Sequence, residues 1–140
     1  MAKAPQTRAF GSVKVGDELP PITIGLTHTG ITAAAIATRD YQPVHHDVER
    51  ARSLGNANVF INTYTTAGYL ERLIVEWAGR DVLLRKIAFR MGVSSYAGDT
   101  MVVKGKVVKV RTEDNCVEIE VIGSNSLGNH AVGTVVAQLP

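Results

Sequence analysis

The chain has 140 residues, 45% hydrophobic and 20% charged, with a formal net charge of +2. This length suits a single domain with one core of ordinary size. Nucleic-acid-binding domains carry clustered Lys and Arg, so the small net charge gives no support to a nucleic-acid partner. No apolar run approaches the roughly 18 residues of a membrane span. We expect an irregular segment at residues 1–12, without a secretory signal, and one domain over residues 13–140.

The only cysteine, Cys116, cannot form a disulfide within the chain. It lies in a strand-like run, which favours a small buried hydrophobic residue over a nucleophile. A protein without disulfides fits a reducing compartment, and we therefore expect a cytoplasmic location.

The first expected elements are an edge strand and a short helix. Residues 13–26 carry a turn signal at Gly16-Asp17, then Pro20-Pro21, then the β-favouring run 22–24. Because proline donates no ladder hydrogen bond, we expect an edge strand that begins after the prolines. Residues 29–39 are rich in Ala and Ile, and we interpret them as a short helix, although residues 32–37 could also form a strand.

Residues 40–47 are expected to form a loop. Pro43 cannot donate to a ladder and disfavours the helical conformation at Gln42. Asp47 then fits the N-cap of a short helix over residues 48–54, which Gly55 ends.

The longest helical candidate runs from Phe60 to Ala78, and Gly79 follows it. At 1.5 Å per residue such a helix is about 30 Å long. Residues 60–70 carry no charge, and Arg72 and Glu76 form an i,i+4 pair on what is predicted to be the single exposed stripe. A helix that is apolar or small on nearly every side is typically buried, so other elements must surround it.

The remaining sequence predicts strands at 82–96, 100–112, 116–124 and 131–139. In the third of these, apolar and acidic residues alternate over 117–121, which indicates one buried face. Hairpin turns are expected at Gly98-Asp99 and at 113–115, and Val107-Val108 breaks the alternation as a bulge would. The order of elements predicts an α+β fold, with a curved antiparallel sheet around a central helix.

The residues best suited to chemistry are Asp40 and His45, five positions apart across a turn stiffened by Pro43. A carboxylate and a neutral imidazole in a poorly hydrated cleft can hold a water molecule and move its protons. Two other interpretations stay open at this point, an Asp that only caps a turn and surface histidines. A metal site that includes His46 and Asp47 is also conceivable, but no distant Cys or His pattern completes it, and we expect none.

Residues 39–47, Arg-Asp-Tyr-Gln-Pro-Val-His-His-Asp, resemble the motif of MaoC-like (R)-specific enoyl-CoA hydratases, which reads Asp-x-Asn-Pro-x-His-x-Asp. The resemblance extends to residues 13–20, 66–70 and 96–100. Further stretches look like the small catalytic subunit of actinobacterial steroid side-chain enoyl-CoA hydratases; they are residues 37–40, 44–47, 77–79 and 125–130.

This resemblance implies a hot-dog fold and the addition of water to a trans-2-enoyl-CoA that carries a bulky acyl group. Asp40 and His45 would be the catalytic pair, and the backbone amide of Thr63 would hold the thioester oxygen. Asn62 and Gln42 are the further expected substrate contacts. Coenzyme A would enter as part of the substrate, without a separate cofactor. The resemblance also implies a homodimer, or a heteromer with a second MaoC-like chain that has lost its own pair.

The sequence departs from the family pattern at three places. Gln42 replaces the usual Asn, Asn62-Thr63-Tyr64 replaces His-Gly-Met, and the hydroxyl residue that supports the Asp in the family is replaced near Glu71. Capping of the helix is the alternative function for Asn62.

Several other residues have simpler interpretations. His28 and His130 are isolated and are interpreted as surface or turn residues, and Trp77 as core. Basic side chains on two expected strands could approach coenzyme A phosphates but fit a solvated face better; they are Lys86, Arg90, Lys104, Lys106, Lys109 and Arg111.

Two rival functions remain. One is an acyl-CoA thioesterase of the hot-dog fold, and the other is a non-catalytic subunit that binds acyl-CoA.

Overall fold

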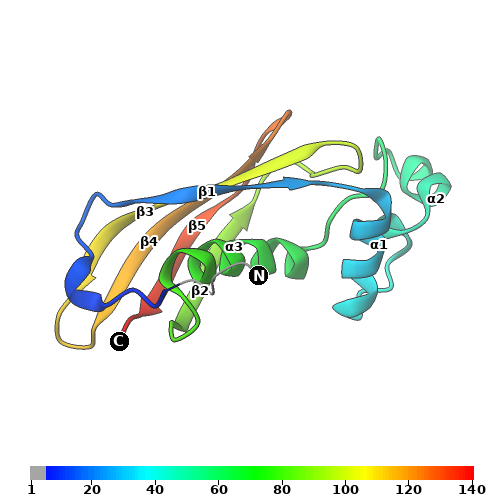
Figure 1. Ribbon diagram of the computed structural model, residues 1–140. Helices are drawn as coiled ribbons and strands as arrows, with labels where there is room; N and C mark the ends of the chain where they lie inside the picture. Colours follow the sequence, from blue (N-terminus) through cyan, green and yellow to red (C-terminus); the bar gives the residue numbers. More distant parts are fainter. Residues whose placement is uncertain (1–5) are drawn as a thin grey trace.

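A computed structural model describes residues 6–140. Their strands form one five-stranded antiparallel sheet with the order β1-β3-β4-β5-β2 (Figure 1). Helix α3 (Thr63–Ala78) lies across one face of this sheet. The α+β hot-dog architecture expected from the sequence is therefore confirmed. The strands are β1 (Glu18–Gly25), β2 (Leu83–Met91), β3 (Thr100–Arg111), β4 (Cys116–Asn125) and β5 (Gly128–Gln138).

Helix α3 packs through one apolar stripe. Leu70, Leu73 and Ile74 are each at most 1% exposed, and Trp77 is buried as expected. Gly105 on β3 makes room for the helix, because a Cβ there would lie 3.1 Å from the Leu73 side chain. The opposite side of α3 faces outward, and Tyr64 is 69% exposed. The helix is thus less enclosed than its composition predicts, because the sheet covers only one of its faces.

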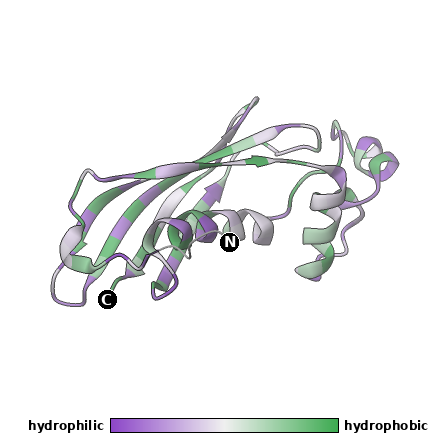
Figure 2. Ribbon diagram, viewed as in Figure 1, coloured by the Kyte–Doolittle hydropathy of each residue, from purple (hydrophilic) through white to green (hydrophobic). Residues whose placement is uncertain are grey.

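The alternating pattern of β4 creates the central part of the core. Val117, Ile119 and Val121 are fully buried, whereas Glu120 points to the outer face. The same alternation of apolar and polar residues runs along the neighbouring strands (Figure 2). The bulge predicted near Val107 is confirmed by a register shift between β3 and β4 at this residue.

Two predictions about the strands are wrong. Strand β1 begins at Glu18 and includes Pro20 and Pro21, because a register shift against β3 between Leu19 and Ile22 accommodates the prolines. Gly98-Asp99 is not a hairpin turn, since β2 pairs with β5 at the far edge while β3 pairs with β1 and β4. The segment after β2 must therefore cross the sheet, and part of it borders the cleft described below.

The helices of the first half gather beyond the N-terminal end of α3 (Figure 1). They are α1 (His28–Ala37), the 3-10 turn η2 (Pro43–His45) and α2 (Val48–Ser53). The Asp47 side chain caps α2 as predicted. Helix α3 begins at Thr63 rather than Phe60, because Asn62 caps it and Phe60 forms a β-bridge with Tyr96.

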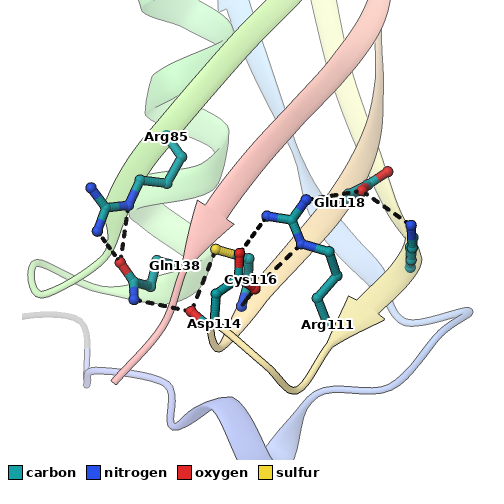
Figure 3. Close-up of polar contacts among 7 residues, drawn as sticks. Arg85, Arg111, Asp114, Cys116, Glu118 and Gln138 are labelled. Atoms are coloured by element: carbon teal, nitrogen blue, oxygen red, sulfur yellow. Dashed lines mark hydrogen bonds and ion pairs between the residues drawn. The ribbon is translucent and has the colours of Figure 1, made fainter.

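The sheet end that carries the β3–β4 turn is tied together by polar contacts (Figure 3). Arg85 on β2 donates to the side chain of Gln138 on β5, which in turn donates to the Asp114 backbone in the turn. Arg111 makes ion pairs with Asp114 and Glu118. Cys116 is buried and has a free thiol.

The predicted irregular N-terminus falls partly on residues 1–5, which lie outside the described residues. Within residues 6–12 the backbone is held at two points, by Arg8 N to Ala78 O and by Phe10 N to Pro140 O, each 2.8 Å. A 3-10 turn, η1, follows at Phe10–Ser12. Within residues 6–140 no helix combines the length and apolarity that a membrane crossing requires.

Candidate active site

A cleft of about 340 Å³ opens at the N-terminal end of α3. One wall is the start of α3 with the loop before it, and the other is the end of β2 with the segment that follows it, residues 91–94. Asp40, His45, Asn62, Thr63 and His130 all line it. Four of the five residues predicted for the site, all except Gln42, therefore meet in one cleft, although they come from two separate segments, and His130 joins them from a third.

The end of α1 aims Asp40 at this cleft. Arg39 has a φ of 56°, a left-handed conformation that is uncommon for residues with a side chain. The reversal is held by a hydrogen bond of 2.9 Å from Asp40 N to Ala35 O. The Oδ1 atom of Asp40 accepts from the backbone N of Gln42, which leaves Oδ2 for contacts within the cleft.

His45 is fixed by contacts to the segment before α3. Its side chain is 8% exposed, and its ring meets the Phe60 ring edge to face at 5.0 Å. The Nδ1 atom lies 2.7 Å from the carbonyl oxygen of Phe60. A carbonyl only accepts, so Nδ1 carries the hydrogen, and Nε2 is the atom left to exchange a proton.

The His45 Nε2 atom lies 3.3 Å from Asp40 Oδ2. Asp40 keeps 24% of its side chain exposed, and both groups border the cleft. Two proton-accepting atoms at this separation can share one proton, so that one group acts as acid while the other acts as base. The arrangement suits the removal of a proton from water and the delivery of another to carbon.

Asn62 connects this pair to α3. Its Oδ1 accepts from Thr65 N at 2.8 Å and caps the helix. Its Nδ2 donates to Asp40 Oδ2 at 3.0 Å and to Thr38 Oγ1 at 2.8 Å. The capping alternative therefore holds, and the side chain has a second function that the sequence did not reveal. Its contact with substrate stays a prediction.

Thr63 and Gln42 have different places in the structure. Thr63 is the first residue of α3 and lines the cleft, and the N–H groups of a first helical turn have no acceptor within the helix. Gln42 is exposed and is not among the cleft-lining residues; only its backbone reaches Asp40. Glu71 lies on the exposed side of α3, and Asn62 instead supports the Asp40 carboxylate.

The interpretation of His130 as a surface residue is wrong. It is 1% exposed and lines the cleft, with Nδ1 donating to Val93 O at 2.7 Å and Nε2 lying 2.9 Å from Thr66 Oγ1. Burial lowers the pKa of this imidazole, against a smaller raising effect of the bond to Val93. An isolated His beside a turn gives no sequence signal for such a place, because the contacts come from distant segments.

No protein-family model matches the sequence. A curated relative from Mycobacterium tuberculosis, the 3-oxo-4,17-pregnadiene-20-carboxyl-CoA hydratase beta subunit, is 39% identical over 121 residues, which are 86% of this chain and 92% of the relative.

Two solved structures share the fold. A chain of the ChsH1-ChsH2 complex from M. tuberculosis is 37% identical with a TM-score of 0.87, covering 91% of this chain and 98% of that one. The (R)-hydratase from A. caviae involved in PHA biosynthesis is 17% identical with a TM-score of 0.86, covering 92% and 98%.

The sheet, the long helix and the carboxylate–imidazole pair in the cleft are the features expected of a hot-dog hydratase, and the fold is shared with the (R)-hydratase from A. caviae. With the identity to the hydratase beta subunit, the chain belongs to the MaoC-like enoyl-CoA hydratase family.

The lowered pKa of His130 predicts a pH dependence of stability. In the unfolded chain this ring takes up a proton near its ordinary pKa of 6.5, whereas the folded protein resists protonation until a lower pH. The unfolded state therefore binds more protons below pH 6.5, and the free energy of unfolding falls as the pH drops from 7 to 5. In His130→Gln this fall should be smaller, as measured by denaturant unfolding at several pH values.

His28→Gln is the matched control, because His28 is exposed and its loss should leave the pH dependence as in the unaltered chain. Equal pH dependence in the His130→Gln variant and the unaltered chain would contradict the assignment of a buried neutral imidazole.

Proposed function

We propose that this chain is the catalytic subunit of an enoyl-CoA hydratase, with Asp40 and His45 as its acid–base pair and the Thr63 amide as the donor to the thioester oxygen. The observation that carries the proposal is the 3.3 Å contact between Asp40 Oδ2 and His45 Nε2 at the edge of a cleft. Because α3 starts at this cleft, a developing negative charge on the substrate would meet free amides and the positive end of the helix dipole.

The reaction requires two proton movements. The water oxygen bonds to the β-carbon while one group of the pair takes a proton from the water. The π electrons move toward the thioester, whose oxygen accepts the hydrogen bond from Thr63 N–H. The other group then delivers a proton to the α-carbon, so that water has been added and the pair holds one shared proton again. Stabilisation of such an oxygen by one amide is worth about 3 kcal/mol of barrier.

The substrate class is inferred from the M. tuberculosis relative, the 3-oxo-4,17-pregnadiene-20-carboxyl-CoA hydratase beta subunit. We propose a bulky, steroid-like acyl group for this chain as well. The cleft volume of about 340 Å³ can take the reacting part of such a thioester, and a larger ring system would extend beyond its mouth. Coenzyme A enters with the substrate, and the proposal requires no further cofactor.

A second MaoC-like chain completes the proposed enzyme. Three large side chains stand exposed at or next to the cleft residues: Tyr41 at 67%, Tyr64 at 69% and Met91 at 42%. Aromatic residues and Met are enriched at protein interfaces. The related chain was solved as a two-protein complex. A cytoplasmic location is part of the same proposal, supported by the free thiol of Cys116.

Substitution of either member of the pair tests the chemistry. Asp40→Asn and His45→Gln, assayed with the second chain, should each lower kcat by about 10²- to 10⁴-fold, since each removes one proton-transferring group. The measurement is the loss of enoyl thioester absorbance. His46→Gln is the matched control, because the neighbouring His46 is exposed and should keep full activity. Near-normal turnover in either variant of the pair would refute the assignment.

The same reactions separate the rival functions. Release of free thiol, detected with a thiol reagent, would favour a thioesterase. Binding of acyl-CoA without turnover in any combination of chains would favour a non-catalytic subunit.

Asn62 is expected to matter for activity beyond its capping function. Asn62→Ser keeps an oxygen that can cap α3 but loses the amide nitrogen that reaches Asp40, so stability should change little while kcat falls about tenfold or more. Thr27→Ala provides the opposite case. It removes the cap of α1, should cost about 1 kcal/mol of stability and should leave kcat unchanged. Equal kcat in Asn62→Ser and the unaltered enzyme would contradict this function.

Assembly with a second chain is tested at the cleft mouth. Tyr64→Asp places a charge on the exposed side of α3 and should abolish co-purification with the second MaoC-like chain while the variant remains folded. Val15→Asp is the control, because Val15 is 63% exposed in the segment before β1. A self-associated pair of this chain, with full activity and no second chain, would argue for a homodimer instead.

A further inference from the structure

His130 bridges the two walls of the cleft. Its Nδ1 donates to Val93 O in the segment after β2, and its Nε2 meets the hydroxyl of Thr66, one turn into α3. The two distances are 2.7 and 2.9 Å, and both His130 and Thr66 are 1% exposed. The ring is therefore a fixed connection at the cleft to two residues that are 37 and 64 positions away along the chain.

The wall after β2 follows the backbone around His130 closely. Gly92 N donates to His130 O at 2.7 Å, and Val93 N donates to Asn129 O at 3.1 Å. A Cβ at Gly92 would lie only 2.2 Å from Asn129 O. The two backbone segments are therefore closer together than a residue with a side chain at position 92 would allow. With these bonds, the position of residues 92–93 is coupled to the position of the His130 ring.

The hydrogen atoms in this network have a defined direction. The carbonyl of Val93 requires the ring hydrogen on Nδ1, which leaves a lone pair on Nε2. Thr66 has one hydroxyl hydrogen and two acceptors within reach, His130 Nε2 at 2.9 Å and Asn62 O at 3.1 Å. Nε2 is the nearer acceptor, and Asn62 O also accepts from Thr66 N at 3.1 Å, whereas Nε2 has no other donor among residues 6–140. The hydroxyl therefore donates to Nε2. Contacts thus continue from Val93 through His130 and Thr66 to Asn62, whose side chain holds Asp40.

We propose that His130 is a positioning residue, which sets the distance between the first turn of α3 and the wall at residues 91–94. The inference rests on the proposed function, because the thioester would lie between these walls with its oxygen at Thr63 N. Loss of the bridge would shift the amide and the Asp40 carboxylate relative to the opposite wall. His130 itself donates and receives no proton in the reaction.

Thr66 provides the cleanest test, because Val replaces Thr with almost the same shape. Thr66→Val removes the donor to Nε2 and should lower kcat about ten- to a hundredfold, with a smaller change in KM. Thr66→Ser keeps the hydroxyl and should stay within about twofold of the unaltered enzyme.

The matched control is Thr65→Val. The Thr65 hydroxyl is also buried, yet it has no hydrogen-bond partner within residues 6–140, so the same substitution should leave kcat unchanged. All enzymes are assayed with the second chain, and the thermal midpoint of each is measured beside kcat.

Substitutions of His130 separate the two halves of the bridge. His130→Asn can keep the donor to Val93 O, whereas His130→Gln can keep an acceptor for Thr66. Each should therefore retain more activity than His130→Leu, which loses both. Should His130→Leu fail to fold, the Thr66 pair decides alone.

The inference is overturned if Thr66→Val keeps the kcat of the unaltered enzyme, or if Thr65→Val loses as much activity as Thr66→Val. Failure of the proposed function is a separate outcome, because it shows as an absence of hydratase activity in the unaltered enzyme assayed with its second chain. In that case the Kd for a saturated acyl-CoA replaces kcat, and equal Kd values for Thr66→Val and Thr66→Ser overturn the inference.

Discussion

The geometry of the candidate site depends most on one side chain, that of Asn62. Its carbonyl oxygen caps α3, and its amide nitrogen holds the carboxylate of Asp40. Because a single planar group makes both contacts, the start of the helix and the position of the acid are determined together. A helix whose N-terminus points at a reacting oxygen is useful only if the proton-transferring groups keep a constant place relative to it. Asn62 meets this requirement at 4% exposure, where solvent does not compete for its hydrogen bonds.

The family resemblance leads us to expect support for Asp40 from further along the helix, near the position of Glu71. Here Glu71 faces outward, and the donor comes from the residue just before the helix. The donor to the carboxylate is a neutral amide, so it brings no second charge into the cleft. Thr38 accepts the other amide hydrogen of Asn62, so the end of α1 belongs to the same network.

The sequence predicted those features that depend on local patterns. The alternation in β4 indicated its buried face, Asp47 and Gly55 indicated the bounds of α2, and Val107 indicated the bulge. The sequence did not predict which strands pair, because β2 reaches β5 through contacts between distant segments. For the same reason Asp40 and His45 were found from one short motif, whereas the place of His130 depends on Thr66 and Val93, 64 and 37 residues away.

The two prolines of β1 have a consequence for the borders of the sheet. Pro20 and Pro21 remove two backbone donors from the outer strand β1, at the point where its register against β3 shifts. An extended chain that approached this border would lack partners for part of its ladder. The other border, β2, contains no proline over Leu83–Met91. The molecule is therefore asymmetric toward strand addition, because prolines protect one border of the sheet and the charged side chains Arg85, Lys86 and Arg90 stand on the other.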